Sequence, residues 1–274
     1  MTEVAKEIGR TPALSLVFPY YENPRMLIRH LVVFRHEWSP ELRDAVEVII
    51  VDDGSPHDRA ADVVAELWNG DRAGLPAISV YRITEDRPWN QHAARNVGAH
   101  VAKAETLMLT DVDHVVPPST LTEILRALPL GKREVLTFGR VDAPSTLTWH
   151  AEHWREFART RRDDGSLKPH VNSMALNREH FWAIGAYDED YAGIYGCDRE
   201  FRIRLFASGT TVRHLHAAPL IRVGRDVIED ASTRGVDRKV AGRNRLKKAV
   251  KIKKAVAGRA DRTLTLTSPW ERAA

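Results

Sequence analysis

The sequence predicts an α/β fold in which a mostly parallel sheet is flanked by helices. Short apolar runs alternate with segments of helical spacing through the first half of the chain, an order typical of parallel sheets with crossover helices. Turn residues such as Asp52-Asp53-Gly54 directly follow the apolar runs. Hydrophobic residues make up 43% of the 274 residues, which is enough for a sizeable core.

Four apolar runs in the first half predict buried strands, because β-branched and aromatic residues fit a pleated sheet. They cover residues 13–18, 46–51, 77–83 and 107–110. Helices are expected between these strands, because apolar residues such as Met26, Leu27, Leu31 and Phe34 recur at helical spacing. We expect these helices at residues 25–37, 58–68 and 91–104.

The second half is less regular. Weaker apolar runs predict strands at residues 134–141, 172–176 and 211–215. Helical spacing predicts helices at residues 120–128, 148–162, 178–184 and 198–208. A segment rich in Gly, Tyr and Asp at residues 185–196 is expected to be a loop before the last helix.

Charge separates an acidic body from a basic tail. Residues 233–274 hold 13 Lys/Arg and 3 Asp/Glu, a net charge of +10, and the whole chain carries +4, so residues 1–232 carry −6. We expect a flexible N-terminus at 1–10, a main domain at 11–226 with halves 11–118 and 119–226, and a basic tail at 227–274. One cysteine, no secretory signal and no apolar run of about 20 residues favour the cytoplasm and predict no transmembrane segment.

The basic tail predicts an anionic partner. Residues 243–257 consist of good helix formers with a narrow apolar stripe, and their cationic face includes Arg243, Arg245, Lys247, Lys248, Lys251 and Lys254. DNA binding needs mainly cations against phosphate, whereas a helix lying on a membrane usually has a larger apolar face. Nucleic acid, an anionic membrane or glycan surface, and the acidic body of the protein itself all stay open as partners.

Two carboxylates, Asp111 and Asp113, directly follow the fourth apolar run. Ligands of open α/β sheets bind outside the carboxyl ends of strands, and paired carboxylates there can share a divalent cation that holds a pyrophosphate. Alternate side chains of an extended chain share one side. Both carboxylates are therefore expected to face the ligand, while the His114 side chain points away from Asp113.

Four blocks, in this order, resemble the nucleotide-sugar glycosyltransferases of GT-A fold, a Rossmann-like fold. The resemblance is to family 2 and to the β-1,4-galactosyltransferase and chondroitin-polymerase type, and it runs from about Leu14 to about His216. The blocks are Phe18-Pro19-Tyr20; Trp89-Asn90-Gln-His-Ala-Ala-Arg95-Asn96-Val97-Gly98; Asp111-Val-Asp113 followed by Val-Val-Pro; and Ile184 to Glu200 followed by Arg204-Leu-Phe.

The resemblance implies a UDP-sugar donor with Mn²⁺ or Mg²⁺ as cofactor. It places donor contacts at Pro19, Tyr20, Glu22, Asp53, Arg95 and Asp111. In this assignment the ring of Tyr20 stacks on uracil, Asp53 holds uridine and Arg95 pairs with phosphate or sugar. The metal ligands would be Asp111 and Asp113, with His214 or its same-face neighbour His216 completing the site.

The resemblance also implies a catalytic carboxylate at Asp198, with Glu200 as the reserve candidate for the base. Two departures concern the acceptor: Cys197 and Ile194 stand where the family pattern has an acidic residue and a tryptophan. The acceptor is therefore expected to differ from N-acetylglucosamine. We assign acceptor contacts to Tyr191, Tyr195 and Cys197.

The sequence thus predicts a metal-dependent inverting glycosyltransferase that uses a UDP-sugar. The basic tail makes a hydroxymethylpyrimidine in DNA a candidate acceptor. One alternative is a bacterial cell-surface polysaccharide or glycolipid transferase, peripheral at the inner membrane face. Another is an inactive domain that only binds sugar nucleotide or nucleic acid. The expected location is the cytoplasm, including that of a host if the protein is phage-encoded.

Overall fold

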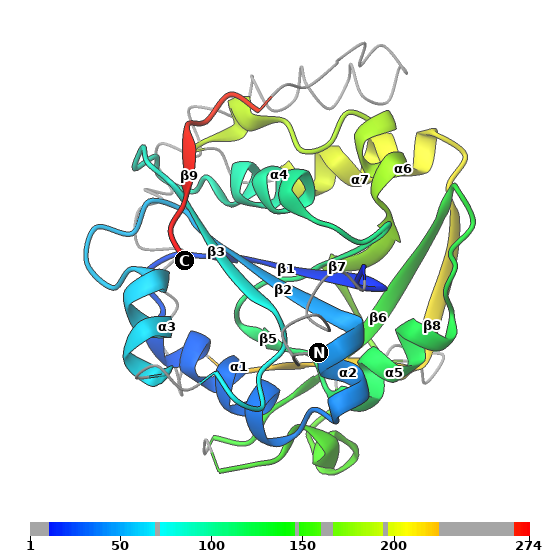
Figure 1. Ribbon diagram of the computed structural model, residues 1–274. Helices are drawn as coiled ribbons and strands as arrows, with labels where there is room; N and C mark the ends of the chain where they lie inside the picture. The colour runs from blue at the N-terminus through cyan, green and yellow to red at the C-terminus, as the bar shows by residue number, and fades with distance from the viewer. Residues whose placement is uncertain (1–10, 69–71, 146–147, 160–166, 194–196, 225–265) are drawn as a thin grey trace, which may run out of the picture.

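The computed structural model describes residues 11–68, 72–145, 148–159, 167–193, 197–224 and 266–274. Within them, nine strands form one sheet in the order β5-β8-β6-β7-β4-β1-β2-β3-β9 (Figure 1). The strands are β1 (Leu14–Tyr20), β2 (Val46–Asp52), β3 (Ile78–Ile83), β4 (Thr106–Leu109), β5 (His114–Val115), β6 (Glu134–Asp142), β7 (Pro169–Asn177), β8 (Thr211–Arg222) and β9 (Trp270–Arg272).

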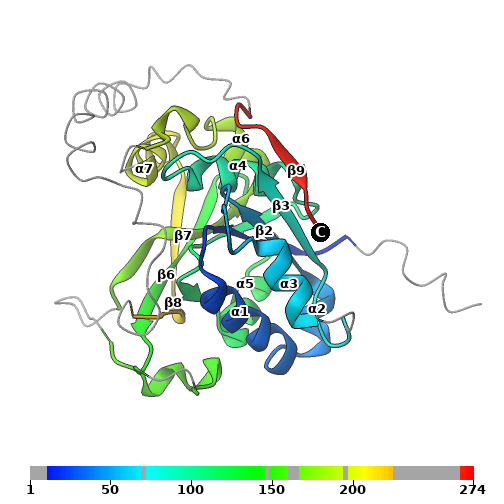
Figure 2. The same ribbon diagram turned by 90° about the vertical axis from the view of Figure 1, so that its left-hand side faces the viewer.

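Helices cover both faces of this sheet. They are α1 (Pro24–His36), α2 (Pro40–Ala45), α3 (Ala60–Trp68), α4 (Gln91–Val101), α5 (Pro118–Arg126), α6 (Arg178–Ala183) and α7 (Cys197–Ala207), with short 3-10 helices η2 (Ala151–Glu156) and η3 (Glu189–Tyr191). Figures 1 and 2 show α4, α6 and α7 on one face and α1, α2 and α3 on the other. Alternate residues of β1 enter two separate cores, with Leu16 and Phe18 on the α1 side and Val17 on the α4 side.

The predicted parallel sheet is present in the first half of the chain. Strand β1 pairs in parallel with β2 and β4, and β2 pairs in parallel with β3. Tyr20 lies opposite Asp52, and the Thr110 amide donates to the Val17 carbonyl at 3.2 Å. The carboxyl ends of three neighbouring strands therefore meet at one edge of the sheet, where the sequence predicts the ligand.

Helix α4 lies directly against β1 because Gly98 has no side chain. A Cβ built at Gly98 would lie 2.2 Å from the Cγ1 atom of Val17, closer than atoms in contact can come. The helix is buried over most of its length, including Arg95 and Asn96. This close approach places Arg95 beside the carboxyl end of β4.

In the second half, β7 runs antiparallel to both β4 and β6, while β6 and β8 are parallel. The sheet is therefore mixed, with the predicted parallel pairing among β1 to β4 and again between β6 and β8. Leu109 pairs with Met174, so the beginning of β7 extends past the end of β4. This reversal adds residues 170–173 to the edge where the parallel strands end.

Two local predictions differ from the structure. The helix expected at 148–162 is the 3-10 helix η2, and Ala158 forms an isolated bridge with Asp142. Its aromatic spacing reflects burial of Trp149, Trp154 and Phe157 rather than a continuous helix. Strand β8 is longer than expected, and a register shift lets its far end pair with β5.

Residues 266–274 rejoin the sheet, which the sequence analysis did not predict. Strand β9 pairs antiparallel with β3, with Ile83 opposite Trp270. The cationic residues between 243 and 254 lie outside the described residues, and the proposed domain boundaries stay a prediction. Of the helices described, none has both the length and the apolar composition that a membrane crossing requires.

Candidate active site

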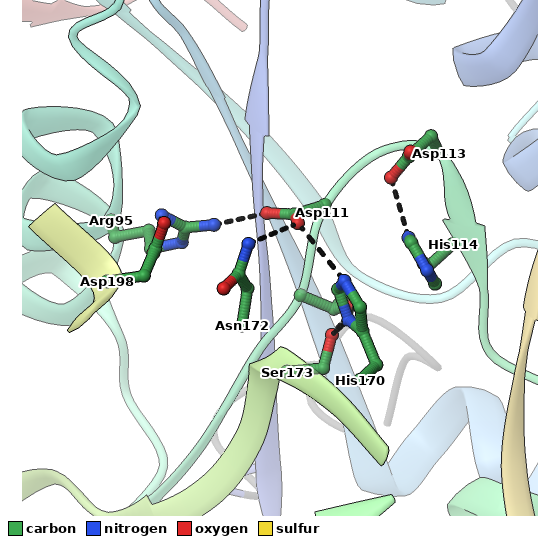
Figure 3. Close-up of polar contacts among 9 residues, drawn as sticks. Arg95, Asp111, Asp113, His114, His170, Asn172, Ser173 and Asp198 are labelled. Carbon is green, nitrogen blue, oxygen red and sulfur yellow. Dashed lines mark hydrogen bonds and ion pairs between the residues drawn. The ribbon is translucent and has the colours of Figure 1, made fainter. Parts of the chain in front are cut away.

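Arg95 joins two carboxylates that are far apart in the sequence. Its Nη2 atom pairs with Asp111 Oδ1, and its Nη1 atom donates to Asp198 Oδ1 at 3.1 Å (Figure 3). The Arg95 side chain is fully buried, with its guanidinium 5.2 Å from the ring centre of Tyr187. The end of β4 and the first turn of α7 therefore form one site around a single fixed positive charge.

Asp198 combines burial with access. Its side chain is 16% exposed, and it belongs to the first turn of α7. Burial raises the pKa of Asp198, while the charge on Arg95 acts in the opposite direction. The carboxylate is therefore a stronger base than an ordinary aspartate, and the guanidinium beside it favours its ionised form.

The segment after β4 is a turn and not an extended chain. The His114 amide donates to the Asp111 carbonyl at 3.0 Å, and His114 Nδ1 lies 2.6 Å from Asp113 Oδ1. The expectation that His114 points away from Asp113 is therefore wrong. The turn brings the imidazole to the Asp111 side of the site, while the Asp113 side chain is 38% exposed.

His170, at the start of β7, is a site residue that the sequence analysis missed. Its Nε2 atom lies 3.5 Å from Asp111 Oδ2, and its ring stacks on that of His114 with centres 3.6 Å apart. Asn172 Nδ2 donates to the same carboxylate oxygen at 3.3 Å. Burial lowers the pKa of His170 to about 3, so the imidazole is neutral at pH 7.

Asp111, His114 and His170 are suited to hold a divalent cation. One ligand atom from each lies within 4.8 Å of the others. His114 Nε2 is buried, and no hydrogen-bond partner for it occurs among the described residues. A neutral imidazole and a carboxylate are the forms that bind metals. The donor set therefore fits a metal that accepts both nitrogen and oxygen ligands.

His214 and His216, the predicted third ligands, lie elsewhere. They belong to β8, which β6 and β7 separate from β4. Three strand spacings amount to about 14 Å. His214 Nδ1 lies 3.1 Å from Thr137 Oγ1, and His216 is exposed. Neither residue belongs to the ligand cluster found within the described part of the chain, and their metal role stays a prediction.

Asp53 provides a buried acceptor at the end of β2. Its Oδ2 atom accepts from the Asn90 amide at 3.0 Å, whereas Oδ1 is buried and has no hydrogen-bond partner in the described residues. Burial raises the pKa of Asp53 well above its usual value. Helix capping falls instead to Asp52, which accepts from the Ser55 and Ala60 amides. Asp53 thus has a buried oxygen that no described residue satisfies in this conformation.

The other predicted donor contacts shape the loop behind this acceptor. Pro19 and Tyr20 are buried in β1, and the Tyr20 hydroxyl donates to the Asp58 carbonyl at 2.6 Å. Because the ring of Tyr20 is 1% exposed, the expected stacking on a base does not occur in this conformation. Glu22 Oε1 accepts from the His57 amide at 2.9 Å, so Glu22 holds the loop that follows β2.

Glu200, the reserve base, has a structural position. Its two oxygens accept from Arg204 Nε at 2.8 Å and from Nη2 at 2.7 Å. Arg204 also donates to the carbonyls of Ile184 and Ala186. This buried ion pair holds the turn before η3, and it directs Glu200 away from Asp198.

The predicted acceptor contacts are covered where they are described. Tyr191 is 0% exposed and Cys197 is 1% exposed, and both belong to the core beneath α4 and α7. Neither side chain offers surface to an acceptor in this conformation. Tyr195 lies outside the described residues, so its assignment stays a prediction.

Comparison with known families agrees with this geometry. Residues 15–185 match the family described as glycosyl transferase family 2, and this stretch contains β1 to β7 and most of the cluster around Asp111. The chain belongs to glycosyl transferase family 2. The resemblance to family 2 that the sequence analysis stated is thereby confirmed.

Two relatives of this family 2 chain carry the name validoxylamine A glucosyltransferase. The protein from Streptomyces hygroscopicus subsp. limoneus is 30% identical over 233 residues, covering 73% of this chain and 49% of the relative. The protein from Streptomyces hygroscopicus subsp. jinggangensis (strain 5008) is 29% identical over 232 residues, covering 73% and 53%. The chain thus spans about half the length of these relatives.

The fold also resembles that of a solved structure, the mannosyltransferase PcManGT from Pyrobaculum calidifontis in complex with GDP-Man and Mn²⁺. The TM-score is 0.57 at 19% identity, and the match covers 95% of this chain and 68% of that chain. At this identity the likeness establishes the GT-A fold of the family 2 chain.

Proposed function

We propose that this family 2 protein transfers a sugar from a nucleotide sugar to an acceptor hydroxyl. The observation that carries the proposal is the bridge from Asp111 through Arg95 to Asp198. The bridge sets the basic carboxylate of Asp198 beside the end of β4, where the donor diphosphate is expected from the resemblance to family 2. Asp53 supplies a buried acceptor for the nucleoside on the neighbouring strand.

The reaction is a displacement at the anomeric carbon with inversion. Asp198 accepts the proton of the acceptor hydroxyl as its oxygen bonds to that carbon. The bond between the anomeric carbon and the diphosphate oxygen breaks, and the nucleoside diphosphate leaves with the electron pair. Arg95 keeps Asp198 ionised before the transfer and offers its charge to the donor phosphates.

Asp111, His114 and His170 would hold a divalent cation, with exposed Asp113 beside them. When bound, the metal would neutralise charge on the leaving diphosphate as a Lewis acid. Two imidazoles in the donor set favour Mn²⁺ over Mg²⁺, which prefers oxygen ligands. The solved structure of similar fold is named as a complex with Mn²⁺.

The donor is proposed to be a UDP-hexose. The sequence blocks resemble UDP-sugar enzymes, and both relatives are named as glucosyltransferases. Two acceptor classes follow from different observations. The cationic residues of 243–254 favour a polyanion such as DNA with hydroxymethylpyrimidines. The name of the relatives favours validoxylamine A or a similar molecule instead.

One reaction series tests the proposal. The protein is incubated with Mn²⁺, UDP-glucose, UDP-galactose, their N-acetyl forms or GDP-mannose, and either duplex DNA containing 5-hydroxymethylcytosine or a set of small polyols. Mass spectrometry of DNA nucleosides and of small products detects a hexose or N-acetylhexosamine gain. We expect nucleoside diphosphate release and a mass gain in one acceptor class. If no donor gives either a product or nucleoside diphosphate release, the result would favour an inactive binding domain.

The base assignment has its own control. Asp198→Asn keeps the shape of the side chain and removes its basicity, so transfer should fall by roughly 10²- to 10⁴-fold. Donor binding, measured by calorimetry, should stay close to that of the unchanged protein. Transfer that survives Asp198→Asn unimpaired would refute the assignment of Asp198 as the base.

A further inference from the structure

Residues 266–274 lie against the donor half of the site, although they are distant from it in the sequence. Strand β9 pairs with β3, and the Thr84 amide donates to the Pro269 carbonyl at 2.9 Å (Figure 1). The ring of Trp270 packs against those of Tyr81 and His100, with centres 5.7 and 5.8 Å apart. The segment is thereby anchored both to the sheet edge and to α4.

Glu189 binds this segment to the loop in front of α7. Its Oε2 atom accepts from the Thr267 amide at 3.0 Å, the Thr267 hydroxyl at 2.6 Å and the Ser268 amide at 2.9 Å. Its Oε1 atom accepts from Asn96 Nδ2 at 3.0 Å. The Asn96 side chain also exchanges two hydrogen bonds with the backbone of Tyr187. One buried carboxylate therefore joins residues 267–268 to α4 at the residue that follows Arg95.

Asn90 extends the same contacts to the nucleoside side. Its Nδ2 atom donates to Ser268 Oγ at 3.3 Å, and its backbone amide donates to Asp53 Oδ2 at 3.0 Å. Both Asn90 and Ser268 are buried. The preceding residue, Trp89, has a positive φ of 57°, a conformation that needs support from its surroundings. Ser268 thus stabilises the turn that presents an amide to Asp53.

Covering the sheet edge explains only part of this arrangement. Pairing of β9 with β3 hides an edge that would otherwise be exposed, and it requires only backbone bonds from residues 269–274. The hydrogen bonds of Thr267 and Ser268 lie outside that pairing and reach Glu189 and Asn90. Glu189 accepts from Asn96, the residue after Arg95, and the Asn90 amide donates to Asp53. The bonds therefore connect residues 267–268 to the candidate donor residues.

We propose that Thr267 and Ser268 are positioning residues of the donor site, which they hold in its binding geometry through Glu189 and Asn90. The inference rests on the proposed use of a nucleotide sugar. It assigns to a segment more than 60 residues beyond Asp198 a role in donor affinity and none in the proton transfer. The effect should appear in the donor Kd and KM, with kcat unchanged.

The test compares Thr267→Val/Ser268→Ala with Glu271→Ala, a matched change at an exposed position of β9. Both keep the backbone bonds of residues 267–272. Calorimetry gives the Kd for the UDP-sugar, steady-state kinetics give KM and kcat, and amide exchange of the ligand-free proteins reports on the Asn90 amide. Circular dichroism and thermal melts confirm folding. Glu189→Gln serves as a second variant of the same contacts.

For the double variant we expect the donor Kd and KM to rise about tenfold, because removing a hydrogen bond to a buried group costs roughly that much affinity. The kcat should stay within about twofold, and the Asn90 amide should exchange faster. Glu271→Ala should match the unchanged protein. Unchanged Kd and exchange, or equal effects in Glu271→Ala, would overturn the proposal. If the unchanged protein binds no donor, the proposed function fails, and exchange at Asn90 alone decides the positioning role.

Discussion

As the proposed base, Asp198 must be ionised to accept a proton, so its pKa is expected to set the acidic limit of the proposed transfer reaction. Burial raises this pKa, and Arg95 followed by Arg202 lowers it. Transfer should therefore increase with pH through the pKa of Asp198. In Arg95→Gln the opposing charge is absent, so the acidic limb of the kcat profile should move to higher pH.

Arg202→Gln is the matched control for this pH profile, because the more weakly acting Arg202 should shift the limb less. Profiles of kcat at saturating donor provide the measurement. An acidic limb that stays in place in Arg95→Gln would show that another group limits the rate.

Thermal stability can distinguish between the proposed metal ligands. A ligand that binds only the folded protein stabilises it by about 2.7 kcal/mol at 100 times its Kd. We expect Mn²⁺ to raise the Tm of the unchanged protein and of His214→Ala, but to have little effect on His170→Ala. The reverse result would restore His214 as the third ligand and remove His170 from the site.

At the scale of elements, the packing of α4 on β1 positions Arg95. Gly98→Ala forces a Cβ against Val17, so the free energy of unfolding should fall by about 1–3 kcal/mol. Gly131→Ala is the matched control, because its Cβ would meet Glu134 at an ordinary 3.5 Å. Denaturant titration measures both. The pair Gly98→Ala/Val17→Ala should recover part of the stability, and equal effects at the two glycines would contradict this packing.

The ion pair in α7 gives a second prediction at this scale. Glu200→Ala leaves Arg204 buried without its carboxylate, which should cost about 3–5 kcal/mol of stability. The kcat of the folded enzyme should remain within about twofold, because Glu200 does not face Asp198. Activity assays below the unfolding transition separate the two effects. A decrease in kcat comparable to that of Asp198→Asn would return Glu200 to the chemistry.

Sequence patterns predicted those elements whose signals are local. Residues 46–51 are apolar except for Glu47 and form the buried core of β2. By contrast, Trp270-Glu271-Arg272 shows no strand periodicity, and only the open edge of β3 makes it a strand. The region 148–162 has helical aromatic spacing, yet burial of its rings is achieved by a 3-10 turn and an extended segment.

The candidate site likewise contains residues that local sequence patterns predict and residues that only the fold brings in. Asp111, Asp198 and Arg95 stand in recognisable blocks, and the structure brings them into contact through Arg95. His170 reaches Asp111 only because β7 runs antiparallel to β4, a pairing between distant segments that no local pattern records. The position of His114 depends on a turn that replaced the expected extended chain.

For the whole molecule, the charge difference between body and basic region can be tested without removing β9. Replacing Lys247, Lys248, Lys251 and Lys254 by Gln lowers the positive charge but keeps residues 266–274. If DNA is the acceptor, DNA affinity should fall and its salt dependence should weaken by about 0.9 for each phosphate that the protein no longer neutralises. Hydrolysis of the donor in water should not change. Fluorescence anisotropy measures the salt dependence of DNA affinity. If this dependence is unaltered, these lysines do not contact a DNA acceptor.

The pairing of β9 with β3 also affects how the protein folds during its synthesis. Thr84 and its partner Pro269 are 185 residues apart. A ribosome adding about 5–20 residues per second needs roughly 10 to 40 seconds to cover that distance. Throughout this interval, β3 is an unpaired strand edge on a nascent chain that already contains β1 and β2. During this interval β3 is therefore open to chaperones and to neighbouring nascent chains, beside the site where the finished protein is proposed to bind its donor.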